Sequence, residues 1–450
     1  MDAILKRAGE LKQTLLNFVL DAEGDLAVAL ETYAAQSSRR QGSEYQGSKS
    51  YMDLVIDRFL TAGKVGHKTP LDCFIESHSA LSEADLTLLN HWRRAFTGLF
   101  AVTQFLADGF QLMNWLTAKH YLVKPNGLQP TEQLARLQAG EIVLTRITPV
   151  TETDWMFSTS LTLMGKLGKP KLAVAIGNFK QSFKADLYGD APELLLEAWH
   201  SVEEYHQEFM DFFGSEEVTL PGYQVNQKLK AFQERSVERR LEAAKIDSTR
   251  SLQDLVDQAG ISQEELAISA QDLGADTTIV TELLEGKLEI PQKPAMAIPQ
   301  INLPDPLQKA EVLTMISHPR WGQMFLPTYY PFKKLLETDN EQNIENAKKL
   351  VYESLKNPQM NAYVWHHLAH QHPKQLEQVL QISLKRPNFD LTQDLDNLLQ
   401  EFDKPLYPEL PEIASVPLHL HNLFQEAVQT VYKSQSKQKI KQKTGTGFQR

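Results

Sequence analysis

The hydrophobic period of the chain changes at Gly98, and this change constrains the fold more than any other feature. Before it, apolar residues recur at helical spacing. After it, the runs GLFAVTQFLADGFQLMNWLTAKHYLV and GEIVLTRITPVTETDWMFS are rich in β-branched and aromatic residues, and Asp108-Gly109 is a strong hairpin signal. Residues 99–165 are therefore predicted to form a small antiparallel β-barrel or a curled sheet.

Residues 1–98 are predicted to form an N-terminal helical region. Two apolar stripes separated by Gly24 predict a helical hairpin, and Ser82 is a plausible N-cap for a helix that reaches about Phe96. The stretch SSRRQGSEYQGSKS at 37–50 is rich in Ser and Gly, which predicts a polar linker or exposed loop.

The chain after the barrel is predicted to be helical, with one interdomain linker. Its strongest element is the amphipathic helix at 191–213, which has Pro192 near its start and Gly214 after its end. The predicted segments are a helical region at 166–247, a helix-turn-helix-like unit at 248–290, a Pro-rich linker at 291–306, a C-terminal helical domain at 307–432 and a basic disordered tail at 433–450. The predicted class is mainly α with a small antiparallel β-barrel insertion, in a multidomain α+β chain.

The composition is that of ordinary globular protein, with 42% hydrophobic and 23% charged residues among 450. The formal net charge of −11 argues against a nucleic-acid binder that uses its whole surface. Cys73 is the single cysteine, so an intramolecular disulfide and a Cys-rich zinc site are excluded. The sequence has no signal-peptide pattern and no apolar run of transmembrane length, which predicts a soluble cytoplasmic protein.

The tail at 433–450 reverses the charge of the rest of the chain. It has no acidic residue, and removing its six positive charges from −11 leaves −17 for the remainder. Such an arm could contact RNA, an anionic surface or an acidic partner, and the alternative is a disordered, solubilising terminus. The candidate contact residues are Lys433, Lys437, Lys439, Lys441, Lys443 and Arg450.

No residue pattern identifies a catalytic, cofactor-binding or metal site. His366 and His370 share a helix face, but no third ligand lies at a fixed spacing. Glu-x-x-His pairs begin at Glu197 and Glu203, yet both pairs fall within one helix. A di-metal site in a helical bundle takes its two pairs from two different helices. The P-loop, GxGxxG and GxSxG motifs are absent from the sequence. We therefore expect no cofactor.

Residues 262–291, SQEELAISAQDLGADTTIVTELLEGKLEIP, resemble a degenerate helix-turn-helix of the phage-repressor superfamily. The resemblance lies in the Glu-Glu-Leu-Ala opening and the Leu-Leu-x-Gly-Lys close, while extra residues lengthen the turn. Acidic side chains such as Asp276 and Glu282 would face the phosphates, and they would be repelled. The unit is therefore expected to contact protein or to pack internally more readily than to bind DNA.

The region at about 85–165 contains Trp92, Phe100, Val102, Gly109, Gly140, Arg146, Pro149 and Trp155. At these positions it resembles a module of uncharacterised bacterial proteins, in which a helical segment precedes a small β-barrel. Some of those proteins also carry the Cys-rich SEC-C motif, whose cysteines are missing here, so no zinc is implied. The resemblance implies an architecture and no known activity.

Trp115 and Trp155 are candidate interface aromatics, because aromatic residues are enriched at binding hot spots. The alternative is that a barrel of this size needs them for its own core. The sequence as a whole predicts a non-enzymatic protein-interaction, assembly or regulatory factor that acts through helical surfaces. Two alternatives stay open: a nucleic-acid-associated factor that uses the tail and the helix-turn-helix-like unit, and an enzyme with a pocket between the barrel and the helix at 191–213.

Overall fold

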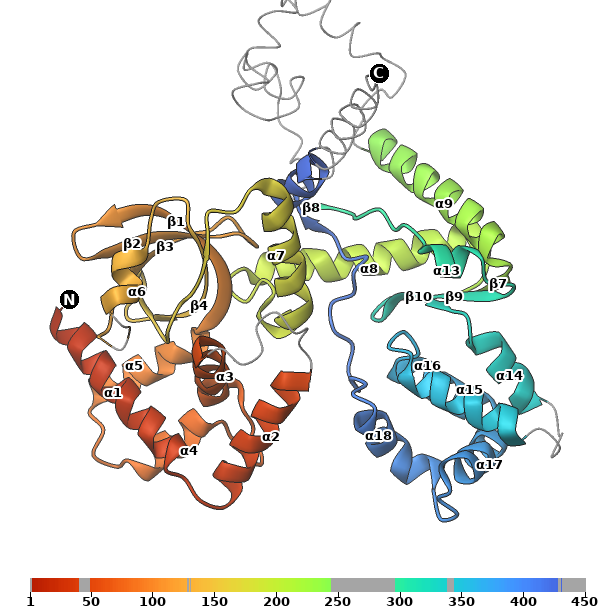
Figure 1. Cartoon of the computed structure of the whole chain (residues 1–450), viewed down its shortest axis with the longest axis horizontal. Helices are drawn as coiled ribbons and strands as arrows, with labels where there is room; N and C mark the ends of the chain where they lie inside the picture. Colours follow the sequence, from red (N-terminus) through yellow and green to blue (C-terminus); the bar gives the residue numbers. More distant parts are fainter. Residues whose placement is uncertain are drawn as a thin grey trace, which may run out of the picture. The chain divides into compact units, whose positions relative to one another are not determined.

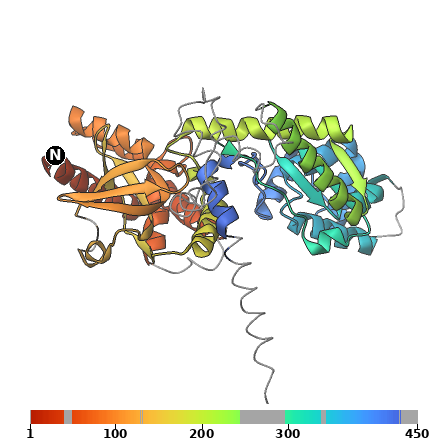
Figure 2. The ribbon, with the colours of Figure 1, turned by 90° about the horizontal axis from the view of Figure 1, so that it is seen from above.

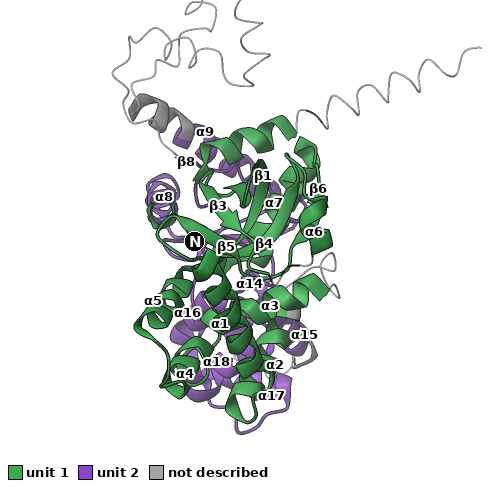
Figure 3. Ribbon diagram, turned by 90° about the vertical axis from the view of Figure 1, so that its left-hand side faces the viewer, with its two compact units in different colours: residues 1–197, 416–450 green, residues 198–415 purple. Residues whose placement is uncertain are grey.

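The computed structural model describes residues 2–39, 49–127, 129, 131–243, 296–337, 344–427 and 430. Contacts within the chain divide it into two compact units, 1–197 with 416–450 and 198–415 (Figure 3). The helix-turn-helix-like residues 262–291, the tail at 433–450 and parts of both predicted linkers lie outside the described residues.

The N-terminal helices gather at one end of the first unit (Figure 1). They are α1 (Asp2–Leu20), α2 (Asp25–Arg39), α3 (Lys49–Ala62), α4 (Pro70–Ser77) and α5 (Glu83–His91). The predicted helical hairpin is α1 and α2, and Gly24 between them has a φ of +67° that glycine adopts at little cost. The Ser82 side chain accepts the Asp85 N–H while the Asp85 carboxylate accepts the Ser82 N–H, so the predicted N-cap is part of a capping box.

A closed five-stranded β-barrel follows these helices, as the sequence predicted (Figures 1 and 2). Its strands run in the order β1-β2-β3-β5-β4, and β1 pairs with β4 to close it, while the short β6 also pairs with β4. Its elements are β1 (Phe96–Leu106), β2 (Gly109–Asn114), β3 (His120–Lys124), α6 (Thr131–Arg136), β4 (Ile142–Pro149), β5 (Asp154–Phe157) and β6 (Thr162–Gly165). Aromatic rings from several strands, including Phe100 and Phe157, fill its interior.

The barrel is mixed, so the prediction of a purely antiparallel barrel is wrong at one pairing. Strands β3 and β5 run parallel, with Val123 opposite Trp155. Parallel neighbours need a long crossover, and here the chain passes through α6 and β4 before β5. The alternation of apolar and polar residues shows which face of a strand is buried, but it is the same for both strand directions.

The predicted hairpin joins β1 and β2 with a turn one residue earlier than the sequence suggested. Leu106 pairs with Gly109, so Ala107 and Asp108 form the turn and Gly109 already belongs to β2. A Cβ at Gly109 would lie 2.6 Å from the carbonyl oxygen of Val123 on the neighbouring strand. Glycine is required there by close backbone approach.

The rest of the first unit consists of helical elements and one short strand. They are η1 (Trp92–Arg94), α7 (Lys169–Ser182), η2 (Lys184–Asp186) and the start of α8, together with the two-residue strand β11 (Val416–Pro417). Helix α8 (Pro192–Phe213) begins and ends as predicted, and Gly214 after it has a φ of +74°. The boundary between the two units falls within this helix.

The second unit combines a small sheet with a helical bundle. Its antiparallel sheet has the order β10-β9-β7. Trp365 is fully buried among the helices that follow the sheet. The elements are β7 (Glu217–Leu220), α9 (Gly222–Ala243), β8 (Met296–Ala297), α13 (Asp305–Gln308), β9 (Leu313–His318), β10 (Gly322–Leu326), α14 (Tyr329–Glu337), α15 (Ile344–Lys356), α16 (Ala362–Gln371), α17 (Pro373–Leu384) and α18 (Leu391–Glu401).

The strands of the second unit correct the prediction that the chain after the barrel is helical throughout. β7 lies in the region 166–247, and β9 and β10 lie in 307–432. The turn between β9 and β10 contains Pro319 and ends at Gly322, whose φ of +72° suits a tight reversal. Short apolar runs such as LTMIS do not distinguish a buried strand from a helix by period alone.

Candidate functional site

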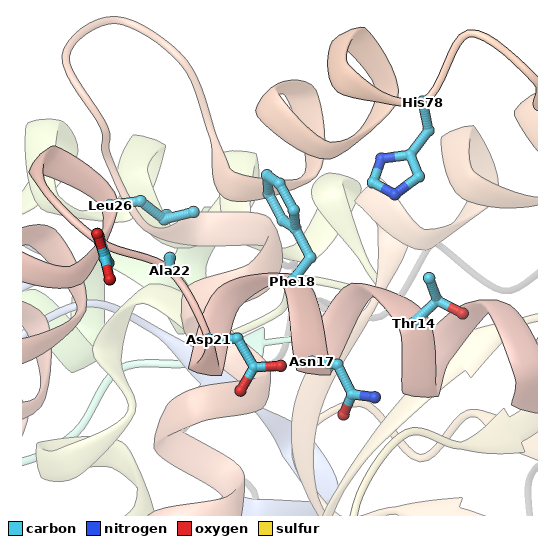
Figure 4. A pocket seen from close by; sticks show the side chains of 8 residues that line it. Thr14, Asn17, Phe18, Asp21, Ala22, Leu26 and His78 are labelled. Carbon is cyan, nitrogen blue, oxygen red and sulfur yellow. The ribbon is translucent and has the colours of Figure 1, made fainter.

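A groove open to solvent lies where α1 ends and α2 begins, opposite the end of α4 (Figure 4). Its volume is about 570 Å³. The lining residues are Thr14, Asn17, Phe18, Asp21, Ala22, Glu23, Leu26 and His78. Several of them are exposed and none is fully buried, so this groove suits a docked segment better than an enclosed small molecule.

The groove depends on a sharp connection between the two helices. The N–H of Asp21 donates to the carbonyl of Asn17 at 2.8 Å, which closes the last turn of α1. Gly24 reverses the chain, and its carbonyl accepts the N–H of Val28 at 3.1 Å in the first turn of α2. The exposed Asp21 and Glu23 are thereby held at the edge of the groove.

Aromatic rings form the wall between α1 and α4. The Phe18 ring rises from α1 toward His78 in Figure 4, with the ring centroids 5.7 Å apart. The His78 ring also lies 4.1 Å from the Phe74 ring, and its Nδ1 donates to the Phe74 carbonyl at 2.9 Å. In the neutral ring this arrangement leaves Nε2 as an acceptor. The wall therefore offers apolar faces together with one acceptor nitrogen.

The electrostatics of the groove favour a cation. The end of α1 carries partial negative charge from its last carbonyls, and its last turn has no basic residue. Asp21 and Glu23 add two carboxylates at the same place. A lysine or arginine could place its charge between these carboxylates and its methylene stem on the Phe18 ring.

A buried ion pair fixes α1 from its other side. Nζ of Lys12 lies 2.6 Å from Oδ1 of Asp57 on α3, and each side chain is 1% exposed. The Lys12 ammonium also lies over the Trp92 ring, 5.2 Å from its centroid. Burial lowers the pKa of Lys12, although the charge of Asp57 opposes that shift.

The same network continues into the barrel through Arg146 of β4. Its Nε lies 3.4 Å from Oδ2 of Asp57, and it donates to Thr61 at 2.6 Å and to the carbonyl of Ala95 at 2.9 Å. Asp186 lies 3.4 Å from Arg146 and 2.7 Å from Arg58. These contacts attach α1 and α3 to the barrel, so the groove rests on a fixed base.

The junction between the barrel and the start of α8 holds a second polar cluster. Oδ2 of Asp190 accepts hydrogen bonds from Asn114 at 3.0 Å, from Thr117 at 2.8 Å and from the hydroxyl of Tyr121. Burial, reinforced by Asp190, raises the pKa of Tyr121. Lys119 donates to the carbonyl of Asp190 at 2.8 Å. The donors to Asp190 come from β2, from β3 and from the connection between them, so Asp190 holds this part of the barrel beside the start of α8. We therefore interpret the cluster as structural.

The two tryptophans proposed as interface residues occupy different environments. Trp155 is 8% exposed and lies in the barrel core, 5.1 Å from the Tyr121 ring and 5.6 Å from the Phe96 ring. The Trp155 ring therefore packs in the barrel core, which was the alternative to an interface role in the sequence analysis. Trp115 is half-buried, and its carbonyl accepts a hydrogen bond from Nε2 of His419 at 2.8 Å.

The groove residues were not identified from the sequence. Phe18 and His78 are distant in the chain, and only the packing of α4 on α1 brings them together. One signal was present: Asp21 follows the C-terminal end of a helix, where an anionic side chain is unfavourable. Such a residue is a candidate for a role other than stability.

The histidine patterns do not gather into a metal site within the described ranges, where no group of three His, Cys, Asp or Glu side chains could hold an ion. Nδ1 of His206 instead lies 3.2 Å from the hydroxyl of Ser317. His366 is paired with Asp396 at 2.9 Å. Among the described helices, none combines the length and the apolar character needed to cross a bilayer.

The candidate contacts of the tail, from Lys433 to Arg450, and the helix-turn-helix-like unit at 262–291 both lie outside the described residues. Their roles stay predictions. Comparison with known proteins found no match to a protein-family model, a curated protein or a solved structure.

Proposed function

We propose that the protein is a non-enzymatic interaction factor that docks a basic segment of a partner protein in the groove between α1, α2 and α4. The observation that carries the proposal is the placement of Asp21 and Glu23 at the negative end of α1, beside the Phe18 and His78 rings. Carboxylates select lysine or arginine, and the aromatic wall accepts their methylene stems or an apolar neighbour.

The shape of the groove supports a segment as the ligand. Asn17, Asp21 and Glu23 are exposed, so the site is a surface feature that a chain can cross from side to side. The anchoring of α1 by Lys12, Asp57 and Arg146 supports a preformed site, because less ordering is needed on binding.

The test is a titration of the full chain against a labelled twelve-residue peptide of alternating Lys and Gln with one central Trp. The same peptide with Glu in place of Lys is the control ligand. We expect micromolar binding of the basic peptide alone, weakened at least about tenfold by the double substitution Asp21→Asn and Glu23→Gln. Asp2→Asn with Glu31→Gln removes two exposed charges from the same helices outside the groove, and this matched control should bind normally.

Two results would contradict the proposal. One is equal binding of the acidic and basic peptides. The other is an equal loss of binding in the groove variant and in the matched control, because binding would then follow net charge and not the groove.

A further inference from the structure

The segment 433–450 carries the chemistry that the groove selects. It contains six basic residues and no acidic one, and it also holds Ile440 and Phe448 as apolar side chains. Lys437, Lys439, Lys441 and Lys443 alternate with other residues. In an extended chain, alternate side chains point to one side with a repeat of roughly 6.5–7 Å. Such a row presents several ammonium groups on one side, opposite in charge to the carboxylates of Asp21 and Glu23.

The described residues before this segment show from which part of the first unit it starts. The preceding residues are held by Lys169, whose Nζ lies 2.7 Å from Glu426, and by the bond of His419 to Trp115. The helical segment 418–427, blue in Figure 1, lies beside α7 at the end of the first unit opposite α1, α2 and α4. The groove of the same copy lies at the opposite end of the unit, so the segment would have to run back along its own unit to reach it, whereas it can meet the groove of a second copy directly.

We infer that segment 433–450 of one copy binds the groove between α1, α2 and α4 of a second copy, so that the chain associates with itself head to tail. This inference rests on the proposed function, because it names the occupant of the same groove. The interface is heterologous, with a donor segment on one copy and an acceptor groove on the next. A heterologous contact leaves one donor and one acceptor unused in every dimer, so association continues to longer species unless a ring closes.

Charge explains why the interaction would be reversible. The chain without the segment has a net charge of −17, so two copies repel each other except where the basic segment meets Asp21 and Glu23. Exposed charges are screened over about 8–10 Å at physiological ionic strength. Raising the salt concentration should therefore dissociate the assembly.

The experiment uses two full-length variants, each defective in one half of the contact. The tail variant carries Lys437→Gln, Lys439→Gln, Lys441→Gln and Lys443→Gln, and the groove variant carries Asp21→Asn and Glu23→Gln. Sedimentation velocity of the natural protein should show species that grow with concentration. Each variant alone should associate at least about tenfold more weakly. An equal mixture of the two should form a dimer and nothing larger, because only one donor and one acceptor remain.

Three results would overturn the inference. The natural protein could stay monomeric up to about 100 µM, well above a micromolar Kd. Each variant could associate as strongly as the natural protein, or the mixture of the two could stay monomeric. The alternating Lys and Gln peptide, titrated against the tail variant, separates this failure from that of the proposed function. If the peptide binds the groove while the mixture stays monomeric, only the self-association fails. If neither binds, both fail.

Discussion

The ammonium of Lys12 lies 2.6 Å from a carboxylate oxygen of Asp57, and both side chains are enclosed between α1, α3 and the barrel. Arg146 approaches the second oxygen of the same carboxylate at 3.4 Å. The buried carboxylate of Asp57 compensates the positive charges of Lys12 and Arg146, and burying those charges without a partner would cost much free energy. Removing Asp57 alone would therefore leave two buried cations without their carboxylate, close to the base of the groove.

We expect Asp57→Asn to lower the free energy of unfolding by about 3–5 kcal/mol, because it leaves Lys12 and Arg146 buried without their carboxylate. Lys12→Met should cost less, since Asp57 keeps Arg146 and the new side chain is apolar. Urea unfolding of both variants measures the difference. If the two substitutions cost the same, the charge of Asp57 is not what the interior requires.

The pair Asp21 and Glu23 should behave in the opposite way, because it serves binding and not stability. Replacing Asp21 by Asn removes an anion from the negative end of α1, which should raise the free energy of unfolding by about 0.3–1 kcal/mol. Urea unfolding of the Asp21→Asn variant, compared with the Glu31→Gln variant as control, measures this change in the free energy of unfolding. A loss of stability in the Asp21 variant alone would show that this carboxylate supports the fold.

Features set by neighbouring residues could be predicted from the sequence. The cap at Ser82, the reversal at Gly24 and the ends of α8 at Pro192 and Gly214 each depend on a few adjacent positions. The barrel was predicted because its alternating runs are long and contain a hairpin signal. These are the cases in which local preference and the final fold agree.

Features set by distant partners could not be predicted in this way. The parallel pairing of Val123 with Trp155 depends on which strand becomes the neighbour after the crossover. The approach of His78 to Phe18 depends on how α4 packs across α1. One sequence carries no record of such contacts, so the groove became visible only in three dimensions.

The positive φ at Gly24 should make the groove sensitive to one added methyl group. A Cβ there would meet no atom within 4 Å, so the cost of Gly24→Ala comes from the backbone alone and should be about 1–2 kcal/mol. Gly177→Ala is the matched control, because Gly177 lies within α7 with equal space and no positive φ. That variant should gain up to about 1 kcal/mol.

Calorimetric Tm values of the two glycine variants test this difference, and the titration with the basic peptide tests its consequence. We expect Gly24→Ala to bind more weakly, since the altered turn displaces Glu23. Equal stability of the two variants would mean that the connection between α1 and α2 relaxes without strain.

The second unit should lose stability in mild acid through His318. Nδ1 of His318 accepts the N–H groups of Arg320 at 3.0 Å and Trp321 at 3.1 Å, an arrangement that only the unprotonated nitrogen can make. Burial, together with the nearby His206, lowers the pKa of His318 to about 4. The unfolded chain binds a proton near pH 6.5, so the stabilisation is complete above that pH and is lost as the pH falls toward 4.

We expect the loss to reach on the order of 1–2 kcal/mol, less than the full linkage value because the ring is partly solvated. Urea unfolding of the natural protein and of His318→Asn, measured from pH 7.5 to pH 4.5, provides the test. Asn can still accept an N–H bond but does not titrate, so its curve should be flatter over this interval. Parallel curves would assign the acid sensitivity to other groups, such as His206, because burial lowers the pKa of His206 as well.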